Sequence, residues 1–198
     1  MTFGSLFAGI GGIDLGLERA GMTCRWQVEI DPYAVRVLTK HWPNVPKYGD
    51  IRTMKGADLE RVDLIAGGFP CQPVSLAGKR RGPSDERWLW PEFARLLREI
   101  RPRYALMENV PGLLVRGMGD VLGDLASIGF NVEWSVLSAC ALGAPHPRER
   151  VFIVAYAQRD HLRLPRCRPT SGAPRRGATA AQEWERLRTQ SRTALRGS

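Results

Sequence analysis

The chain has 198 residues, of which 43% are hydrophobic, enough for one domain with a buried core and a short appended segment. Its net charge of +9 is concentrated at the end, because residues 1–156 carry +2 and residues 157–198 carry +7. The sequence argues against a membrane protein, a disulfide scaffold or a zinc ribbon: no apolar run approaches the ~20 residues of a membrane helix, the start lacks a signal-peptide pattern, and the four cysteines form no C-x-x-C pair.

Apolar periodicity predicts that strands and helices alternate over residues 1–156. In chain order we expect a strand at 2–7, a helix at 12–19, a strand at 24–30, a helix at 33–41, a short strand before residue 50, a strand at 62–66, a helix at 88–100, a strand at 104–107, a helix at 121–128, and strands at 131–137 and 151–156. Asp31 should cap the second helix, with Pro32 in its first turn, where a missing N–H leaves nothing unpaired. The alternation predicts an α/β fold with a mostly parallel sheet and helices on both faces.

Candidate ligand-binding segments follow the first three expected strands, where parallel sheets bind ligands. Residues 7–12 are rich in glycine, which lets the backbone approach a ligand closely, although a plain tight turn is the alternative. Glu29 could accept hydrogen bonds from ribose hydroxyls, and Asp50 from an adenine amino group. An exposed acid and a helix or turn cap are the ordinary alternatives for these two residues.

Residues suited to covalent chemistry come at the ends of the next two strands. Cys71 lies among glycines and prolines directly after an apolar strand, where the chain must turn out of the sheet, and this position predicts a nucleophile. Glu108 follows an apolar strand and should be partly shielded from water, as a proton donor requires, unless it is a cap or an ion-pair partner. Arg148 and Arg150 would share one face of an extended segment, where either could hold a carbonyl oxygen or phosphate, or form a surface salt bridge.

Taken in order, these segments resemble the C5-cytosine-specific DNA methyltransferases. Residues 7–12 (FAGIGG) resemble the first cofactor motif of that family, and Glu29 and Asp50 resemble its ribose-side and adenine-side acids. Residues 68–72 (GFPCQ) resemble the nucleophile motif, residues 108–110 (ENV) the next catalytic motif, and residues 143–150 (GAPHPRER) the segment that ends in paired arginines. The resemblance covers residues 2 to 156.

The resemblance implies a Rossmann-like S-adenosylmethionine-dependent methyltransferase domain over residues 1–156, followed by a flexible, Arg-rich tail over residues 157–198. It implies transfer of a methyl group from S-adenosylmethionine to C5 of a cytosine flipped out of double-stranded DNA, with no metal. Cys71 would add to C6 of the base, Glu108 would act at N3, and Arg150 would bind O2. The implied catalytic residues are Cys71, Glu108, Arg148, Arg150, Asn109, Pro70 and Gln72. The implied cofactor-binding residues are Phe7, Ala8, Gly9, Ile10, Gly11, Gly12, Glu29, Ile30, Asp50, Ile51, Gly68, Pro70 and Leu89, with residues 88–90 packing around the cofactor. A basic loop would contact DNA through Ser75, Lys79, Arg80 and Arg81.

The sequence departs from the family pattern after the paired arginines. Family members continue into a target-recognition region and a last segment with a Gly-Asn-Ser/Ala-Val type signature, and neither is recognisable here. Three explanations of this departure stay open: a truncated and inactive remnant, a subunit completed by another polypeptide, and a minimal enzyme whose weak sequence specificity comes from its basic tail. The alternatives to an active DNA methyltransferase are a non-catalytic protein that binds cofactor or nucleic acid and, as a lesser one, an RNA cytosine-5 methyltransferase. The basic tail is either a contact with DNA phosphates or a solvated end. The resemblance implies DNA methylation in the cytoplasm, at the nucleoid in a bacterium or phage, and leaves restriction-modification, phage and housekeeping roles open.

Overall fold

The computed structural model describes residues 1–70 and 88–158, which belong to a unit spanning Met1–Leu162. The described strands are β1 (Thr2–Leu6), β2 (Thr23–Val28), β3 (Lys47–Tyr48), β4 (Leu64–Gly67), β5 (Tyr104–Asn109), β6 (Phe130–Ser138) and β7 (Glu149–Ala157). The helices are α1 (Gly12–Arg19), α2 (Pro32–His41), α3 (Trp90–Ile100), α4 (Leu113–Arg116) and α5 (Met118–Ile128), with 3-10 turns η1 (Ile51–Thr53), η2 (Gly56–Asp58) and η4 (Cys140–Leu142).

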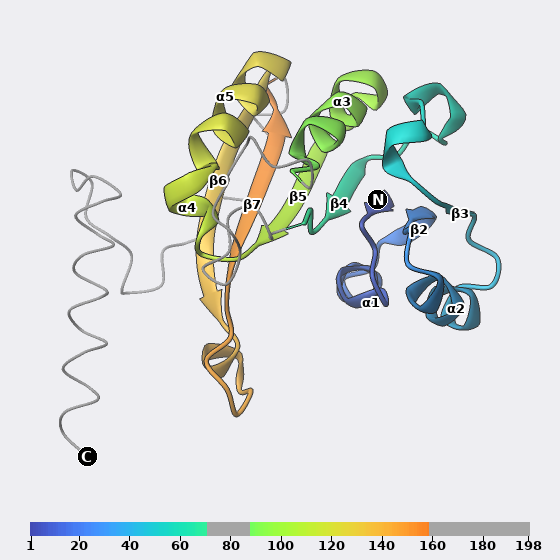
Figure 1. Cartoon of the computed structure of the whole chain (residues 1–198), viewed down its shortest axis with the longest axis horizontal. Helices are drawn as coiled ribbons and strands as arrows, with labels where there is room; N and C mark the ends of the chain where they lie inside the picture. The colour runs from blue at the N-terminus through green and yellow to red at the C-terminus, as the bar shows by residue number, and fades with distance from the viewer. Residues whose placement is uncertain (71–87, 159–198) are drawn as a thin grey trace. The chain divides into compact units, whose positions relative to one another are not determined.

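The strands form one seven-stranded sheet in the order β3-β2-β1-β4-β5-β7-β6 (Figure 1). The pairs β2–β3, β1–β2, β1–β4 and β4–β5 are parallel, whereas β7 is antiparallel to both β5 and β6. The predicted mostly parallel sheet is therefore confirmed. The antiparallel strand arises because β6 and β7 form a hairpin, and β7 inserts between β6 and β5.

Apolar side chains are buried in two clusters, which lie against the helices. The larger cluster packs α3 and α5 against the sheet and includes Phe93, Leu97, Leu125, Met107 and Ile153. The smaller cluster packs α1 against β1, β2 and β4 and includes Leu17, Phe3, Cys24 and Leu64. Helices thus cover both faces, as the sequence predicts, and Figure 1 shows α1 and α3 on opposite sides of the sheet.

The α2 helix begins as its sequence predicts. The carboxylate of Asp31 accepts a hydrogen bond of 2.9 Å from the N–H of Tyr33, and Pro32 is the first helical residue. An N-cap acid and a proline at the start both favour helix initiation, because they satisfy or avoid orphan N–H groups. The end of β2 and the start of α2 are therefore fixed within a few residues of Glu29.

Two differences from the expected boundaries concern the site. The β5 strand includes Glu108 and Asn109, which were expected to follow it, because pairing with β7 continues through Glu108–Phe152 and Asn109–Val151. The short helix α4 was not expected, since its four residues are too few for a periodic signal.

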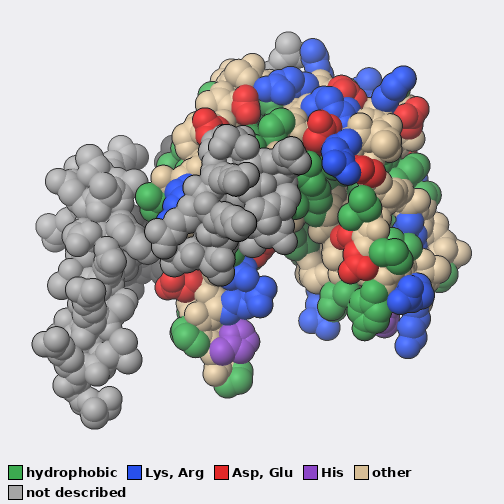
Figure 2. Space-filling view, in the orientation of Figure 1, with side chains coloured by type: hydrophobic (Ala, Val, Ile, Leu, Met, Phe, Trp, Pro, Cys, Tyr) green, Lys and Arg blue, Asp and Glu red, His purple; other side chains and the backbone are tan. Residues whose placement is uncertain are grey.

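Charged side chains of both signs lie on the surface of the described residues. Basic and acidic side chains are interspersed on the face shown in Figure 2, in keeping with the net charge of +2 over residues 1–156. Among the described residues, none of the helices combines the length and the apolar character needed to cross a membrane.

Candidate active site

The expected ligand-binding residues gather at the carboxyl ends of β1, β2, β4 and β5. The strand order reverses between β1 and β4, because β1 has β2 on one side and β4 on the other. Ligands of open α/β sheets bind at such a switch point. The loop after β1, Glu29 after β2, Gly68 after β4 and Glu108 in β5 all lie at this edge of the sheet.

The loop between β1 and α1 adopts backbone conformations that favour glycine. The backbone φ angle is positive at three loop residues: +53° at Phe7, +55° at Gly9 and +87° at Gly11. Phe7 is the one of the three with a side chain, so its backbone is strained. A Cβ atom at Gly11 would lie 2.5 Å from the Trp42 ring, so a side chain does not fit there. Gly11 is the N-cap of α1 and has no side chain to cap it, and Asp14 in the first turn accepts from its own backbone N–H. Uncapped N–H groups at the start of a helix can bind a polar or anionic ligand.

Glu29 holds this loop through backbone hydrogen bonds. Its Oε2 accepts from the N–H of Gly9 at 2.7 Å, and its Oε1 accepts from the N–H groups of Ile30 and Asp31, both at 2.8 Å. Each carboxylate oxygen offers two lone-pair positions, so Oε2 can accept one further hydrogen bond, for example from a hydroxyl. The neighbouring apolar side chains of Ile30 and Ile10 are 63% and 62% exposed. The position of Glu29 therefore fits the predicted ribose contact.

Asp50 and Ile51, two implied cofactor contacts, are held by other parts of the protein. Asp50 caps η1 through the N–H of Arg52 at 3.0 Å, and both its oxygens accept from the Arg52 side chain, the shortest contact being 2.6 Å. These bonds, the side-chain bond with Arg52 first, lower the pKa of Asp50. Ile51 is 3% exposed and lies in the core, and its implied contact with the cofactor stays a prediction. The structure thus shows the cap that was the alternative for Asp50, and the adenine contact stays a prediction.

Two glycines at the end of β4 allow neighbouring strands to approach closely. A Cβ atom on Gly67 would lie 2.2 Å from the carbonyl oxygen of Leu6, and one on Gly68 would lie 2.8 Å from Oε2 of Glu108. The structure therefore places Gly68 beside the expected catalytic glutamate. Its implied contact with the cofactor stays a prediction.

Asn109 ties β5 to the segment that leaves β4. Its Nδ2 donates to the carbonyl oxygen of Phe69 at 3.1 Å, and its Oδ1 accepts from the N–H of Val110 at 2.9 Å. Asn109 is 2% exposed. The resemblance implies that Asn109 helps to order the site, and these bonds are consistent with that role because Phe69 immediately precedes Pro70 and the expected nucleophile. The role itself stays a prediction.

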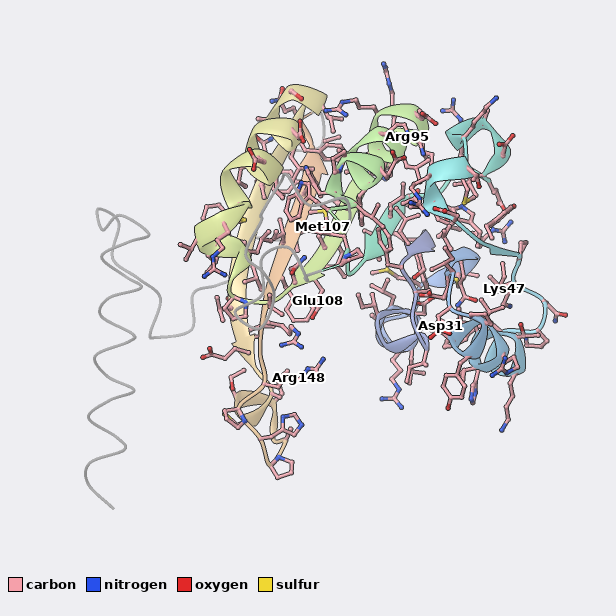
Figure 3. All side chains as sticks on the ribbon, viewed as in Figure 1. Asp31, Lys47, Arg95, Met107, Glu108 and Arg148 are labelled. Atoms are coloured by element: carbon pink, nitrogen blue, oxygen red, sulfur yellow. The ribbon has the colours of Figure 1, made fainter. Side chains whose placement is uncertain are left out.

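Glu108 and Arg150 form an ion pair at the same edge. Nε of Arg150 lies 2.7 Å from Oε1 of Glu108, and about a quarter of each side chain is exposed. The two side chains share one face of the sheet, because Glu108 pairs with Phe152, two residues beyond Arg150 on β7. Arg148 precedes β7 and is exposed, and Figure 3 shows it farther from Glu108, toward the β6–β7 turn. The structure thus brings Glu108 together with Arg150 rather than with both arginines, and it shows the ion pair that was the alternative for these residues. The catalytic roles of Glu108, Arg148 and Arg150 stay predictions.

An aromatic cluster supports this edge from within the core. Phe69 is 2% exposed, with its ring centroid 5.6 Å from that of Trp88 and 5.4 Å from that of Trp90. Phe7 stacks on Phe93 with centroids 6.4 Å apart. Trp88 and Trp90 are core residues, 7% and 1% exposed, and the expectation that residues 88–90 pack around a cofactor stays a prediction. Leu89 between them is partly exposed, and its role as a cofactor contact stays a prediction.

Several expected site residues lie outside the described ranges. They are Cys71, Gln72, Ser75, Lys79, Arg80 and Arg81, together with the tail from residue 159 onward. Their roles stay predictions. Within residues 1–70 and 88–158 no group of three or more His, Cys, Asp or Glu side chains is arranged to hold a metal ion.

Two residues that support the β1–α1 loop were missed from the sequence. Trp42 packs against Gly11, and its carbonyl oxygen accepts a hydrogen bond from Nζ of Lys47. Asp14 is fully buried in the first turn of α1, between β1 and β2. Its position three residues before Leu17, on the apolar face of the predicted helix, is the signal that could have revealed it.

Comparisons with known proteins agree with this geometry. The family model for C-5 cytosine-specific DNA methylase matches residues 1–193. Type II methyltransferase M.BsuFI of Bacillus subtilis is 38% identical over 161 residues, which cover 79% of this chain and 39% of the relative. Type II methyltransferase M.NgoMIV of Neisseria gonorrhoeae is 41% identical over 163 residues, which cover 78% of this chain and 52% of the relative. The chain therefore spans about half the length of these relatives or less.

Solved structures share the same architecture. A prophage-encoded protein of E. coli, described as a DNA modification methyltransferase, superposes with a TM-score of 0.70 at 27% identity, covering 88% of this chain and 52% of that protein. Spodoptera frugiperda DNMT2 gives a TM-score of 0.70 at 23% identity, covering 88% of this chain and 55% of the neighbour, a likeness that concerns the fold alone. The fold is thus the Rossmann-like methyltransferase fold that the sequence predicts.

Proposed function

The chain belongs to the C-5 cytosine-specific DNA methylase family, and from this membership we propose that it transfers a methyl group from S-adenosylmethionine to C5 of cytosine in double-stranded DNA. The Type II methyltransferases among its relatives favour DNA as the substrate and a restriction-modification role in the cytoplasm.

The ion pair between Glu108 and Arg150 is the observation that carries this proposal. N3 and O2 are neighbouring atoms on one edge of a cytosine ring, so two groups that bind them must lie side by side. The carboxyl of Glu108 and the guanidinium of Arg150 are 2.7 Å apart and partly exposed at the carboxyl edge of the sheet. Glu108 would supply the proton or hydrogen bond at N3, and Arg150 would stabilise the charge that develops at O2.

The residues around the β1–α1 loop fit S-adenosylmethionine. The cofactor supplies an electrophilic methyl group on a sulfonium centre. Glu29 Oε2 accepts from the N–H of Gly9, and its second lone pair would accept from a ribose hydroxyl. The uncapped first turn of α1 offers N–H groups to a carboxylate. A Cβ atom at Gly9 or Gly12 would meet no atom within 4 Å, so open space adjoins the loop.

Cys71 would supply the nucleophile. C5 of cytosine reacts poorly with an electrophilic methyl group until its electron density is raised. Attack by the Cys71 thiolate forms an Sγ–C6 bond and moves the C5–C6 electron pair onto C5, which then takes the methyl group. Loss of the C5 proton to water and cleavage of the Sγ–C6 bond return the thiolate and release 5-methylcytosine.

The target base must leave the duplex for this chemistry, since C6 is inaccessible in stacked DNA. Ser75, Lys79, Arg80 and Arg81 would contact the phosphates near the flipped base. These contacts predict a steep loss of DNA affinity with salt, because each neutralised phosphate releases counterions.

The experiment that tests the proposal is transfer of a tritiated methyl group from S-adenosylmethionine to mixed duplex DNA by the 198-residue chain. We expect incorporation by the wild type and none by Cys71→Ser. Transfer RNA is run in parallel as a substrate. Incorporation into RNA alone, or incorporation that survives Cys71→Ser, would contradict the proposal.

A second candidate, a catalytic subunit that needs a further polypeptide, is favoured by exposed apolar side chains. Leu137 on β6 and Val154 on β7 are each 41% exposed, on the face of the sheet that carries Glu108 and Arg150. An activity that appears only when a target-recognition region of a relative is added would support this candidate.

A further inference from the structure

A fully buried carboxylate joins the three elements from which the site emerges. Asp14 of α1 is 0% exposed. Its Oδ2 accepts a hydrogen bond of 2.9 Å from the hydroxyl of Ser5 on β1, and its Oδ1 accepts one of 2.8 Å from Nε2 of Gln27 on β2. One side chain thus links the helix to two adjacent strands.

These bonds lie directly beneath the two expected cofactor contacts. Ser5 and Gln27 are register partners in the parallel β1–β2 pair. Ser5 is two residues before Phe7, where the loop begins, and Gln27 is two residues before Glu29. The N–H of Gly9 then bonds to Glu29 above them. The distance between the loop and Glu29 therefore depends on how α1 is held against β1 and β2.

The surroundings of Asp14 disfavour a charged carboxylate, so a contribution to core stability does not by itself account for an acid at this position. Burial raises the pKa of Asp14, which shows that its charged form is disfavoured there. The thiol of Cys24 lies 3.8 Å from Oδ1, and within the described residues Oε1 of Gln27 is buried without a hydrogen-bond partner. A leucine would fill similar space without burying a carboxylate, so stability alone does not explain an acid here.

We propose that Asp14 is a positioning residue for cofactor binding, which fixes the β1–α1 loop relative to Glu29 through Ser5 and Gln27 without touching the cofactor. This inference rests on the proposed function, because the loop and Glu29 are there assigned to S-adenosylmethionine. Asp14 acts in the free protein, so its effect on the loop is measurable without any ligand.

The test compares three variants of the 198-residue chain. Asp14→Leu removes both hydrogen bonds, whereas Asp14→Asn keeps them, because the Ser5 hydroxyl can accept from the new amide. Asp63→Leu is the matched control: Asp63 holds the opposite end of β1 through the N–H of Thr2 at 2.8 Å and is far along the strand from the loop.

Two measurements are made on each variant. Without cofactor, hydrogen exchange of the N–H groups of residues 8–11 should accelerate at least about tenfold in Asp14→Leu, and remain unchanged in Asp14→Asn and Asp63→Leu. By calorimetry, the Kd for S-adenosylmethionine should rise at least about tenfold in Asp14→Leu and stay within about threefold in the other two. If Asp14→Leu does not fold, Ser5→Ala serves instead, because it removes one of the two hydrogen bonds. It should accelerate exchange at residues 8–11 and raise the Kd for S-adenosylmethionine, each by a smaller factor.

The two readouts separate the inference from the proposed function. A wild-type chain that binds no S-adenosylmethionine refutes the assigned cofactor, while the exchange data still decide the role of Asp14. Unchanged exchange at residues 8–11 in Asp14→Leu overturns the inference. An equal acceleration of exchange at residues 8–11 in Asp63→Leu also overturns the inference, because the effect would then be general destabilisation.

Discussion

Replacing Asn109 by alanine tests how the segment before Cys71 is anchored. The substitution removes the hydrogen bond from Nδ2 to the carbonyl oxygen of Phe69 and the acceptor of the Val110 N–H. The Phe69 carbonyl is then left unpaired in the core, which costs about 1–3 kcal/mol, while the partly exposed Val110 N–H regains water at about 1 kcal/mol or less. We expect the free energy of unfolding to fall by about 1–4 kcal/mol in total.

The assay is urea unfolding followed by circular dichroism, with thermal unfolding as a second measure. A loss of this size should lower Tm by about 2–4 °C for each kcal/mol in a domain of this length. Asn44→Ala makes the same chemical change at an exposed position and should alter stability by less than about 0.5 kcal/mol. Asn109→Asp should be at least as harmful as Asn109→Ala at pH 7, since it sets a carboxylate oxygen against the Phe69 carbonyl. An Asn109→Ala protein as stable as Asn44→Ala would refute the anchoring role.

Four further predictions concern Asp14, Asp63, Gly68 and Cys24. Burial raises the pKa of Asp14 above 3.8, so the folded protein favours the protonated carboxyl and its free energy of unfolding falls as pH rises through the folded-state pKa. In urea titrations, the difference in free energy of unfolding between the wild type and Asp14→Asn should therefore shrink with rising pH. A backbone hydrogen bond from Thr2 lowers the pKa of Asp63 below 3.8, so the free energy of unfolding falls as pH falls through the folded-state pKa. The difference in free energy of unfolding between the wild type and Asp63→Asn should therefore grow as pH rises. Gly68→Ala would push the Glu108 carboxylate by a few tenths of an ångström, and should lower methyl transfer about 10–100-fold with little loss of Tm. Burial, followed by nearby negative charges, raises the pKa of Cys24 to about 12, so peptide mapping should find this thiol modified by an alkylating reagent only after unfolding.

Matched controls sharpen these tests. The difference in free energy of unfolding between wild type and variant should change with pH in opposite directions for Asp14→Asn and Asp63→Asn. A change in the same direction for both would contradict the assigned causes. Gly16→Ala lies on α1 where a Cβ atom meets nothing within 4 Å, so it should stabilise the helix slightly and leave methyl transfer unchanged. Equal methyl transfer by Gly68→Ala and Gly16→Ala would exclude the close contact with Glu108. Cys140 is exposed and should be alkylated in the folded protein, where protection would be unexpected.

The order of elements followed from local signals in the sequence. Asp31 and Pro32 mark the start of α2 because capping and the fixed φ of proline act within a few residues. The carboxyl ends of the parallel strands brought the loop, Glu29 and Glu108 to one edge, which topology alone dictates. These parts of the site could therefore be predicted without coordinates.

The remaining parts depend on tertiary contacts that local patterns do not encode. The bond from Asn109 to Phe69 joins residues 40 positions apart, and Asp14 meets Gln27 only because β1 and β2 are adjacent. Asp50 was assigned to a ligand, but the guanidinium two residues later engages both its oxygens. Residue spacing alone did not separate Arg148 from Arg150, although the resemblance assigned O2 of the base to Arg150. In the structure β7 begins between them, and Arg150 forms the ion pair with Glu108.

The most direct test of the proposed mechanism is covalent trapping on duplex DNA that contains 5-fluorocytosine, in the presence of S-adenosylmethionine. Fluorine at C5 blocks the final elimination, so the Sγ–C6 bond should persist, and peptide mapping should find the nucleotide attached to Cys71. The Cys71→Ser chain should form no adduct. An adduct on another residue, or no adduct from a chain that binds both cofactor and DNA, would contradict the mechanism.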